Sequence, residues 1–281
     1  MEAIDVSIAP LIDDKTIVLA EPGTLEELLR DNPINPSAIT ELTIIGSLNY
    51  SDMSMLSRFN NLRVLDMENV ISEGIGAYTF YLQKRLTSIK LPKTLKTIGE
   101  GAFDGCSNLT GNLTIPESVT TIGDGAFYGC TGFTGNLTIP KGVTTIEPNT
   151  FRNCSGLTGN LTIPEGVTTI GSSAFRECKG FTGLTLSEGV TTIEDEAFGR
   201  CSEQMTENLT IPKSVTTIGK NAFSKIMDLY CKAMTPPQIQ EDSFFLTATT
   251  TLYIPKNCTE VYRTAPGWSE LTFKAIIEID F

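Results

Sequence analysis

Apolar side chains in the middle of the chain recur at a spacing of about 24 residues. One copy of this pattern, from Asn112 to Gly135, reads NLTIPESVTTIGDGAFYGCTGFTG. Its phenylalanine recurs with steps of 24, 24, 24, 23 and 25 residues, at Phe103, Phe127, Phe151, Phe175, Phe198 and Phe223. A fixed period of this size is typical of a solenoid, in which each copy forms one coil. Because a single coil cannot enclose a core, the pattern predicts that neighbouring coils stack.

The inward positions of one copy can be chosen by residue type. In the copy that begins at Asn112 we expect them to be Leu113, Ile115, Val119, Ile122, Ala126, Phe127, Cys130 and Phe133. Leu113 and Ile115 alternate with polar residues, which predicts a short strand that pairs in parallel with its neighbours about 4.8 Å away. Pro116 ends this strand because it has no amide hydrogen. Val119 and Ile122 lie three residues apart, which favours a bend, and the glycines before Phe127 predict a turn or one short helical turn.

Both ends of the chain depart from the repeat. Residues 1–86 predict an N-terminal cap with a helix that begins after Thr24, a strand over residues 38–45, a second helix from Ser51 and a degenerate copy at Thr79-Phe80. Residues 87–228 hold the regular copies. Residues 229–281 predict a degenerate copy and a C-terminal cap, closed by the bulky residues Tyr262, Trp268, Leu271 and Phe273.

These features predict one continuous solenoid domain of the α/β repeat class, with stacked parallel short strands. It should be mostly β and loop, with a small helical N-terminal cap. The fifth copy is one residue short and has Ser187 where the other copies have proline. We therefore expect a local kink in the spine at that copy.

Five of the seven cysteines follow the same period, at Cys106, Cys130, Cys154, Cys178 and Cys201. Equally spaced cysteines cannot all pair, and the chain has no Cys-x-x-Cys motif, so we interpret this column as buried free thiols rather than a metal or redox site. Cys231 and Cys258 fall on neighbouring coils and could form a disulfide. They also occupy apolar columns, which favours plain core packing.

The chain has 281 residues, a net charge of −12 and a pI near 4.6. This charge argues against binding to nucleic acid and against a polybasic membrane contact. No apolar run approaches the roughly 20 residues that a membrane span requires, and no secretory leader follows Met1, although a trimmed chain would look the same. The absence of histidine excludes Ser-His-Asp and Cys-His catalysis. We expect no cofactor, no metal ion and no enzymatic activity.

Charged residues also recur. Those that follow the proline position are Lys93, Glu117, Lys141, Glu165, Glu188 and Lys213. We expect opposite charges to stack there, each exposed pair contributing about 0.2–1 kcal/mol to stability. Three successive acids, Glu194, Asp195 and Glu196, are most simply a solvated turn, although a hydrolase that uses acid residues stays a third hypothesis.

Polar residues with the same period mark the solvent side of the predicted sheet. The threonines are Thr114, Thr138, Thr162, Thr185 and Thr210, and the asparagines are Asn112, Asn136, Asn160 and Asn208. These nine residues are our candidates for partner binding, because they offer a regular polar surface to a protein or glycan. Two plainer readings are that threonine suits an exposed strand and that stacked asparagines bond one another. A flat array of threonines would also suit an ice-like ligand.

The motif L-x-I-P-x-x-V-x-x-I-x-x-x-A-F-x-x-C, from Leu113 to Cys130, resembles the BspA-like (Treponema-type) leucine-rich repeat family. The resemblance extends from about Thr79 to Asp228. The segments from Gly23 to Asp66 and from Tyr230 to Trp268 resemble the caps of secreted Bacteroides-type members. The resemblance implies a right-handed leucine-rich-repeat solenoid in a secreted or surface-anchored protein. The family is associated with adhesion and host-protein binding but has no shared ligand motif.

Two functions follow as hypotheses. The first is a non-enzymatic, secreted or cell-surface interaction module, monomeric, that binds a host or neighbouring-cell protein or glycan through its sheet face or the adjoining loops. The second is a structural spacer that has no ligand of its own. We expect neither nucleic acid nor direct membrane insertion in either case.

Overall fold

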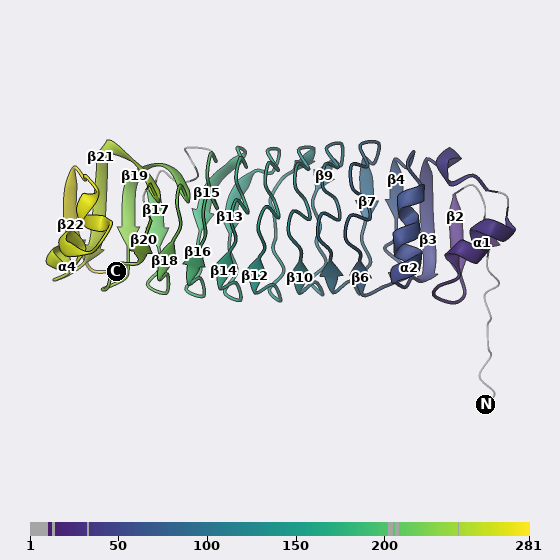
Figure 1. Cartoon of the computed structure of the whole chain (residues 1–281), viewed down its shortest axis with the longest axis horizontal. Helices are drawn as coiled ribbons and strands as arrows, with labels where there is room; N and C mark the ends of the chain where they lie inside the picture. The colour runs from purple at the N-terminus through teal and green to yellow at the C-terminus, as the bar shows by residue number, and fades with distance from the viewer. Residues whose placement is uncertain (1–10, 13–14, 33, 202–204, 206–207, 241) are drawn as a thin grey trace, which may run out of the picture.

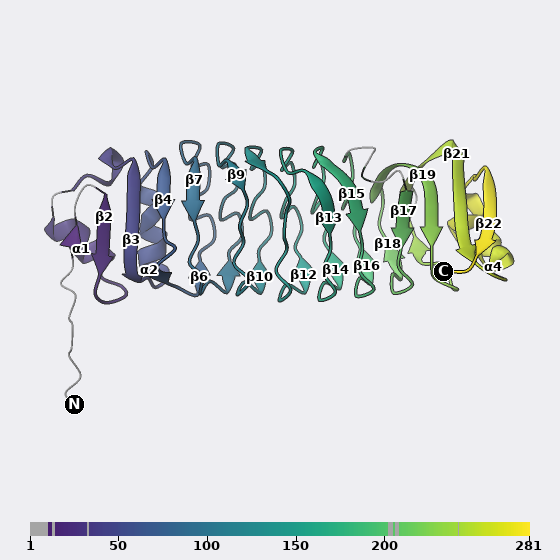
Figure 2. The same ribbon diagram turned by 180° about the vertical axis from the view of Figure 1, so that it is seen from behind.

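The computed structural model describes residues 11–12, 15–32, 34–201, 205, 208–240 and 242–281. Coils stack side by side along one axis, with the N-terminal and C-terminal coils at opposite ends (Figures 1 and 2). One hydrophobic core runs inside the coils without a break from Ile17 to Trp268. The stack is a leucine-rich-repeat solenoid, mostly strand and loop with few helices, as the sequence predicts.

One row of strands lies at or just before the Leu-x-Ile-Pro segments. In the copy that begins at Asn112 the strand predicted at Leu113 and Ile115 is wrong, because β9 (Gly111–Asn112) ends at Asn112. At its N-terminal end lie β1 (Leu11–Ile12), β2 (Thr16–Leu19), β3 (Glu41–Ser47), β4 (Val64–Asp66), β5 (Val70–Ile71) and β7 (Ser88–Lys90). It continues through β9 (Gly111–Asn112), β11 (Phe133–Thr134), β13 (Gly159–Thr162), β15 (Phe181–Thr185), β17 (Asn208–Ile211), β19 (Phe223–Cys231), β21 (Phe244–Pro255) and β22 (Ala275–Ile279). Among the described strands only β1 and β2 pair antiparallel, and the other pairs are parallel.

A second row of strands was not predicted. It consists of β6 (Gly74–Ile75), β8 (Thr97–Ile98), β10 (Thr121–Ile122), β12 (Thr145–Ile146), β14 (Thr169–Ile170), β16 (Thr192–Ile193), β18 (Thr217–Ile218) and β20 (Gln238–Ile239). The predicted bend over Val119–Ile122 is therefore wrong for its last two residues, which form strand β10. Ile122 points into the core and Thr121 faces solvent, and this alternation over two residues suffices for a strand because Thr97–Ile98 lies beside it in register.

The turn around each column phenylalanine forms a third ladder between coils. Of the two predicted alternatives, a turn or one short helical turn, the structure has the turn. In the coil of Phe127 it is flanked by two residues with positive φ, Gly125 (58°) and Gly129 (68°). In that coil the amide of Phe127 donates to the carbonyl of Thr150 in the next coil at 2.9 Å. Equivalent amide-to-carbonyl bonds of 2.7–3.3 Å recur from Tyr78 to Phe223. Backbone groups at the turns thus hold neighbouring coils together as the strands do.

The column phenylalanines lie over one another. Ring centroids of successive members are 5.2–5.8 Å apart and their planes differ by at most 12°, over Phe80, Phe103, Phe127, Phe151, Phe175, Phe198, Phe223 and Phe244. The predicted kink at the short fifth copy is wrong for this column, since Phe175 and Phe198 are 5.4 Å apart and 2° from parallel. The fifth copy, which is one residue short, is instead accommodated in the sheet. There the register between β13 and β15 shifts between Gly159 and Asn160.

The cysteine column is buried and reduced, as predicted, and Cys231 and Cys258 are also free thiols. Each column thiol donates to the carbonyl of a phenylalanine in the preceding coil, for example from Cys154 Sγ to Phe127 O at 3.1 Å. Burial raises the pKa of the Cys106 and Cys201 thiols to about 12 and that of Cys231 to about 11. These thiols are therefore protonated core groups and poor nucleophiles at neutral pH.

The described residues of the N-terminal cap include the short helices α1 (Leu25–Asp31), η1 (Pro36–Ala38), α2 (Tyr50–Met55) and η2 (Leu56–Arg58). The predicted helix after Thr24 is present, but the Thr24 side chain does not cap it. The buried carboxylate of Asp52, from α2, accepts instead from the amides of Gly23 at 2.5 Å and Leu25 at 2.9 Å. One carboxylate therefore joins the starts of two helices.

The C-terminal cap covers the last coil with aromatic side chains, as predicted. It contains α4 (Thr259–Thr264) and η3 (Trp268–Glu270). The Trp268 ring lies 5.7 Å from Phe244, and its Nε1 donates to the carbonyl of Pro237 at 2.8 Å. The Tyr262 hydroxyl donates to the carbonyl of Ala233 at 2.6 Å. Both rings thus close the core while their polar atoms stay bonded.

The six charged residues that follow the proline position, from Lys93 to Lys213, all lie in the described ranges. The ion pairs predicted between neighbours in this column do not form. Lys93 contacts Glu68 at 2.8 Å, and Glu188 contacts Lys232 at 3.8 Å. The column residues are solvent-exposed, so attraction between them is too weak to order the long side chains.

Candidate interaction surface

The nine candidate residues lie together on the outer side of the first strand row. The strands that carry them include β9, with Asn112, β13, with Asn160 and Thr162, and β17, with Asn208 and Thr210. Eight of the nine are exposed and Thr210 is half-buried, while the leucines between them are buried. We call this surface the sheet face, defined by Asn112, Thr114, Asn136, Thr138, Asn160, Thr162, Thr185, Asn208 and Thr210.

The asparagines of the sheet face have a structural task. Asn160 Nδ2 donates to the hydroxyls of Thr162 and Thr185, both at 3.1 Å, so asparagine here bonds threonine and not a stacked asparagine. The side chain of Asn136 lies over Gly159 of the next coil, where a Cβ would overlap its Oδ1. Glycine is needed at position 159 for a second reason, since its φ is +80°.

The threonine hydroxyls of the sheet face differ from those of the threonines that precede the second-row strands. One residue before strands β14, β16 and β18 of the second row, Thr168, Thr191 and Thr216 each donate to a backbone carbonyl of the preceding coil, at 3.1–3.3 Å. On the sheet face, the hydroxyls of Thr114 and Thr138 have no hydrogen-bond partner among the described residues. The hydroxyls of Thr168, Thr191 and Thr216 are thus used by the fold, and these two sheet-face hydroxyls face solvent.

The residues that occupy the position of Thr114 in successive coils form one file along the stack. Beyond the threonines this file continues into residues that we did not single out as site residues. In register after Thr210 come Tyr230, Tyr253 and Ile277. The two tyrosine rings stack with centroids 4.4 Å apart and planes 7° apart. Burial, with help from the Asp228 charge, raises the pKa of Tyr230, so its hydroxyl stays protonated. Residues 229–231 (Leu-Tyr-Cys) and 252–255 (Leu-Tyr-Ile-Pro) align with residues 113–116 (Leu-Thr-Ile-Pro). This alignment could have predicted that the two tyrosines occupy the position of Thr114.

Towards the N-terminal end the same file holds the charged residues Asp66 and Lys90, after Thr16 and Thr43. Lys90 contacts Asp66 at 2.7 Å and Glu68 at 3.5 Å. Burial alone would raise the pKa of Asp66, but hydrogen bonds from Lys90 and from the Glu68 amide hold it below its usual value. From Asp66 onward the surface therefore changes from paired charges through hydroxyls to aromatic rings.

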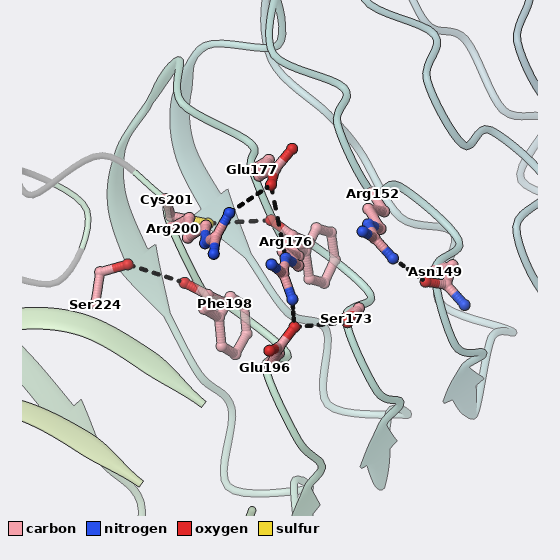
Figure 3. A network of polar contacts seen from close by, with 11 residues as sticks. Asn149, Arg152, Ser173, Arg176, Glu177, Glu196, Phe198, Arg200, Cys201 and Ser224 are labelled. Atoms are coloured by element: carbon pink, nitrogen blue, oxygen red, sulfur yellow. Dashed lines mark hydrogen bonds and ion pairs between the residues drawn. The ribbon is translucent and has the colours of Figure 1, made fainter. Parts of the chain in front are cut away.

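The acidic turn at residues 194–196 joins coils and is not simply solvated. Glu194 accepts from the amide of Ser172 at 2.9 Å, and Asp195 accepts from the amide of Lys220 at 2.8 Å. Glu196 forms an ion pair with Arg176, which lies between Glu196 and Glu177 (Figure 3). Their carboxylates are thus engaged in contacts between coils.

Nowhere in the described ranges do three or more potential ligand side chains gather in a way that would hold a metal ion. Of the helices in the described part of the chain, none has the length and hydrophobicity that crossing a bilayer demands.

The repeat matches a protein family. The family model described as BspA type leucine rich repeat region matches residues 73–202 and 158–266, in six copies. The chain belongs to the BspA-type leucine-rich repeat family. Members of this repeat family and fold are generally non-enzymatic. The comparison with curated proteins gives no match.

Two solved structures are similar to this BspA-type chain. A leucine rich cell surface protein from Faecalibacterium prausnitzii is 26% identical with a TM-score of 0.50, over 66% of this chain and 59% of that one. A leucine-rich repeat protein from Bacteroides ovatus is 23% identical with a TM-score of 0.61, over 87% of this chain and 62% of that one, which shows the shared fold. The BspA-type chain thus spans about three fifths of the length of each.

Proposed function

We propose that this protein is a non-enzymatic interaction or adhesion module, secreted or at the cell surface, that binds a protein or glycan through its sheet face. The observation that supports this most is the pair of threonine hydroxyls, on Thr114 and Thr138, that face solvent without a partner in the described structure. An exposed hydroxyl can both donate and accept, which suits hydrogen bonding to peptide groups or sugar hydroxyls. A cell-surface location is supported by the description of the Faecalibacterium relative.

The tyrosines extend the proposed surface. Tyr230 and Tyr253 place two stacked rings and two hydroxyls at the C-terminal end of the same file. Tyrosine is enriched at interface hot spots because one side chain offers apolar area and a polar tip. A partner that covers the threonines and the tyrosines would therefore gain hydrogen bonds and aromatic contact from one straight row.

Charge substitutions on the two strand rows test this proposal. A variant with Thr138→Lys and Thr162→Lys should fold as wild type does and should lose capture of immobilised glycans or matrix proteins. The matched control carries Thr97→Lys and Thr121→Lys, which are also exposed threonines on adjacent coils but lie on the second row. Wild-type capture by the sheet-face variant would contradict the proposal, and equal loss in both variants would indicate a charge effect.

A spacer function is the second candidate. It is favoured by the unbroken core from Ile17 to Trp268 and by the regular stacking of the coils, which together form a rod. Such a rod needs no ligand. Wild-type protein that captures nothing from a panel of immobilised glycans and extracellular-matrix proteins would favour the spacer over the interaction module.

A further inference from the structure

One turn around the column phenylalanines carries a carboxylate that is flanked by aromatic and aliphatic side chains. The turn holds Asp104 between two glycines with positive φ, Gly101 (54°) and Gly105 (72°). A Cβ at Gly101 would overlap the ring of Tyr78, and a Cβ at Gly105 would overlap the side chain of Leu82. Both of these side chains come from the preceding coil and therefore lean over the turn that holds Asp104.

Tyrosines occupy the position of Asp104 in the coils before and after it. These are Tyr81 and Tyr128, which follow the column phenylalanine as Asp104 does. Backbone bonds set the three turns in register, from Leu82 N to Asp104 O at 2.7 Å and from Gly105 N to Tyr128 O at 2.8 Å. The phenylalanine rings beneath these turns are 5.2 and 5.3 Å apart in successive coils. Asp104 thus lies midway between two tyrosine positions that are two coil spacings apart.

The carboxylate of Asp104 has no compensating partner. It makes no hydrogen bond and no ion pair with any residue that the structure describes. Burial raises the pKa of Asp104, and no cationic group among the described residues opposes that effect. The neighbouring Glu100 differs, since it accepts a hydrogen bond from the Tyr78 hydroxyl. A carboxylate that is partly withdrawn from water and unpaired is stabilised when a cation reaches it.

The next tyrosine in the column already binds a guanidinium of this chain. Arg152 Cζ lies 5.4 Å from the centroid of the Tyr128 ring, and Arg152 Nη1 donates to Asn149 Oδ1 at 3.3 Å (Figure 3). A guanidinium group stacks on an aromatic ring and also pairs with a carboxylate through two parallel hydrogen bonds. A carboxylate beside tyrosine rings therefore suits arginine better than a quaternary ammonium group, which has no hydrogen to donate.

We propose that this turn binds an arginine side chain of a protein partner. The guanidinium pairs with the Asp104 carboxylate and packs against Tyr78 and Tyr81, which are each 49% exposed and meet edge to face at 5.9 Å. Leu82, also exposed, contacts the aliphatic part of the arginine. The net charge of −12 favours a partner with a basic surface. The site lies on the turns and not on the sheet face, so it is independent of the proposed function.

Titration with two short peptides tests the proposal. The first is an acetylated and amidated Gly-Arg-Gly peptide, and the second has citrulline in place of arginine, which keeps the shape but removes the charge. Protein amide chemical shifts measure the binding. Wild-type protein should bind the arginine peptide about ten-fold more tightly than the citrulline peptide. Asp104→Asn should abolish this preference.

Two matched controls separate the site from general effects. Glu117→Gln removes the same unit charge at an exposed position outside this turn and should keep the wild-type preference. Tyr81→Leu should weaken binding of the arginine peptide by about three-fold, because it removes one ring. Phe245→Leu makes the same kind of change at the same position of a remote coil and should bind as wild type does. Asp104→Asn should also keep the wild-type melting temperature, since its carboxylate makes no bond within the described structure.

Three results would overturn the proposal. These are undetectable binding of the arginine peptide at millimolar concentrations, equal affinity for the arginine and citrulline peptides, and an unchanged preference in Asp104→Asn. Tighter binding of choline than of the arginine peptide would also overturn it, since the rings would then serve a quaternary ammonium ligand. A lowered melting temperature of Asp104→Asn would contradict it as well, because the carboxylate would then serve the fold.

Discussion

The turns around the recurring phenylalanines, which we call the turn ridge, and the sheet face repeat with the same period. The two regions use their recurring residues differently. On the ridge, the recurring phenylalanines and cysteines are buried, and each column thiol bonds a backbone carbonyl. On the sheet face, the recurring threonines are mostly exposed, and Thr114 and Thr138 bond nothing in the described structure. A recurring polar residue is therefore a candidate for binding only where its polar atoms are not used by the neighbouring coil.

The largest expected effect concerns the thiols of the ridge together. Burial raises the pKa of Cys106 and Cys201 from the ordinary value of 9.0 to about 12, and burial also raises the pKa of Cys130, Cys154 and Cys178 well above it. The unfolded chain thus loses these protons first, so the stabilisation is complete below about pH 9 and is lost as the pH rises towards 12. Urea unfolding at pH 7, 9 and 10 should show a falling free energy of unfolding. Cys154→Ala should reduce this dependence, and a flat profile would mean that the thiols are not buried.

The next largest effect is on a single ring of the ridge. Phe151→Ala removes a fully buried side chain from the stack and should lower the free energy of unfolding by about 3–5 kcal/mol. Phe245→Ala is the matched control, since this exposed phenylalanine should cost less than about 1 kcal/mol. Chemical denaturation measures both. If Phe151→Ala cost less than about 1 kcal/mol, the phenylalanine column would not be core.

A smaller effect tests whether the sheet-face asparagines serve the fold. Gly159→Ala places a Cβ at a φ of +80° and against the Asn136 side chain, and it should destabilise by about 1–2 kcal/mol from the backbone alone. Adding Asn136→Gly should recover the part that is due to the overlap. If the double variant were no more stable than the sum of the two single changes, Asn136 would not cover Gly159.

The smallest effect on stability is expected on the exposed threonines. Thr138→Lys should change the free energy of unfolding by about 0.5 kcal/mol or less, because the side chain is exposed and its hydroxyl makes no bond within the described residues. Thr168→Lys, one residue before β14, should cost more, because its hydroxyl bonds the carbonyl of Thr144 at 3.3 Å. Equal costs at the two positions would remove the distinction between threonines whose hydroxyls the fold uses and those whose hydroxyls face solvent.

The periodic residues predicted the fold well because burial depends on residue type. Phe127, Cys130 and Leu113 could be assigned to the core from spacing alone, and the structure confirms this. The second strand row was missed because Thr121–Ile122 is two residues long, too short for a period of two to be recognised. Its pairing depends on the neighbouring coils, which spacing within one copy does not reveal.

The site was harder to predict than the fold. The nine polar residues could be placed on one face from the sequence, but not the use of Asn160 to bond Thr185 in the next coil. A hollow of about 430 Å³, lined by residues that include Arg176 and Phe245, lies at two small residues, Gly199 and Ser224, that look unremarkable singly. Both features arise between coils, so residue type alone could not predict them. Whether the sheet face binds a partner stays a prediction.

Hydrogen exchange on the protein with and without a captured partner tests the central claim most directly. In the free protein, turn amides that donate to the next coil, such as Phe127 and Phe151, should exchange slowly. On binding, we expect added protection over residues 112–114, 136–138 and 160–162 and none over the second-row strands at 121–122, 145–146 and 169–170. Added protection confined to the second row, or fast exchange at the turn amides, would contradict the account.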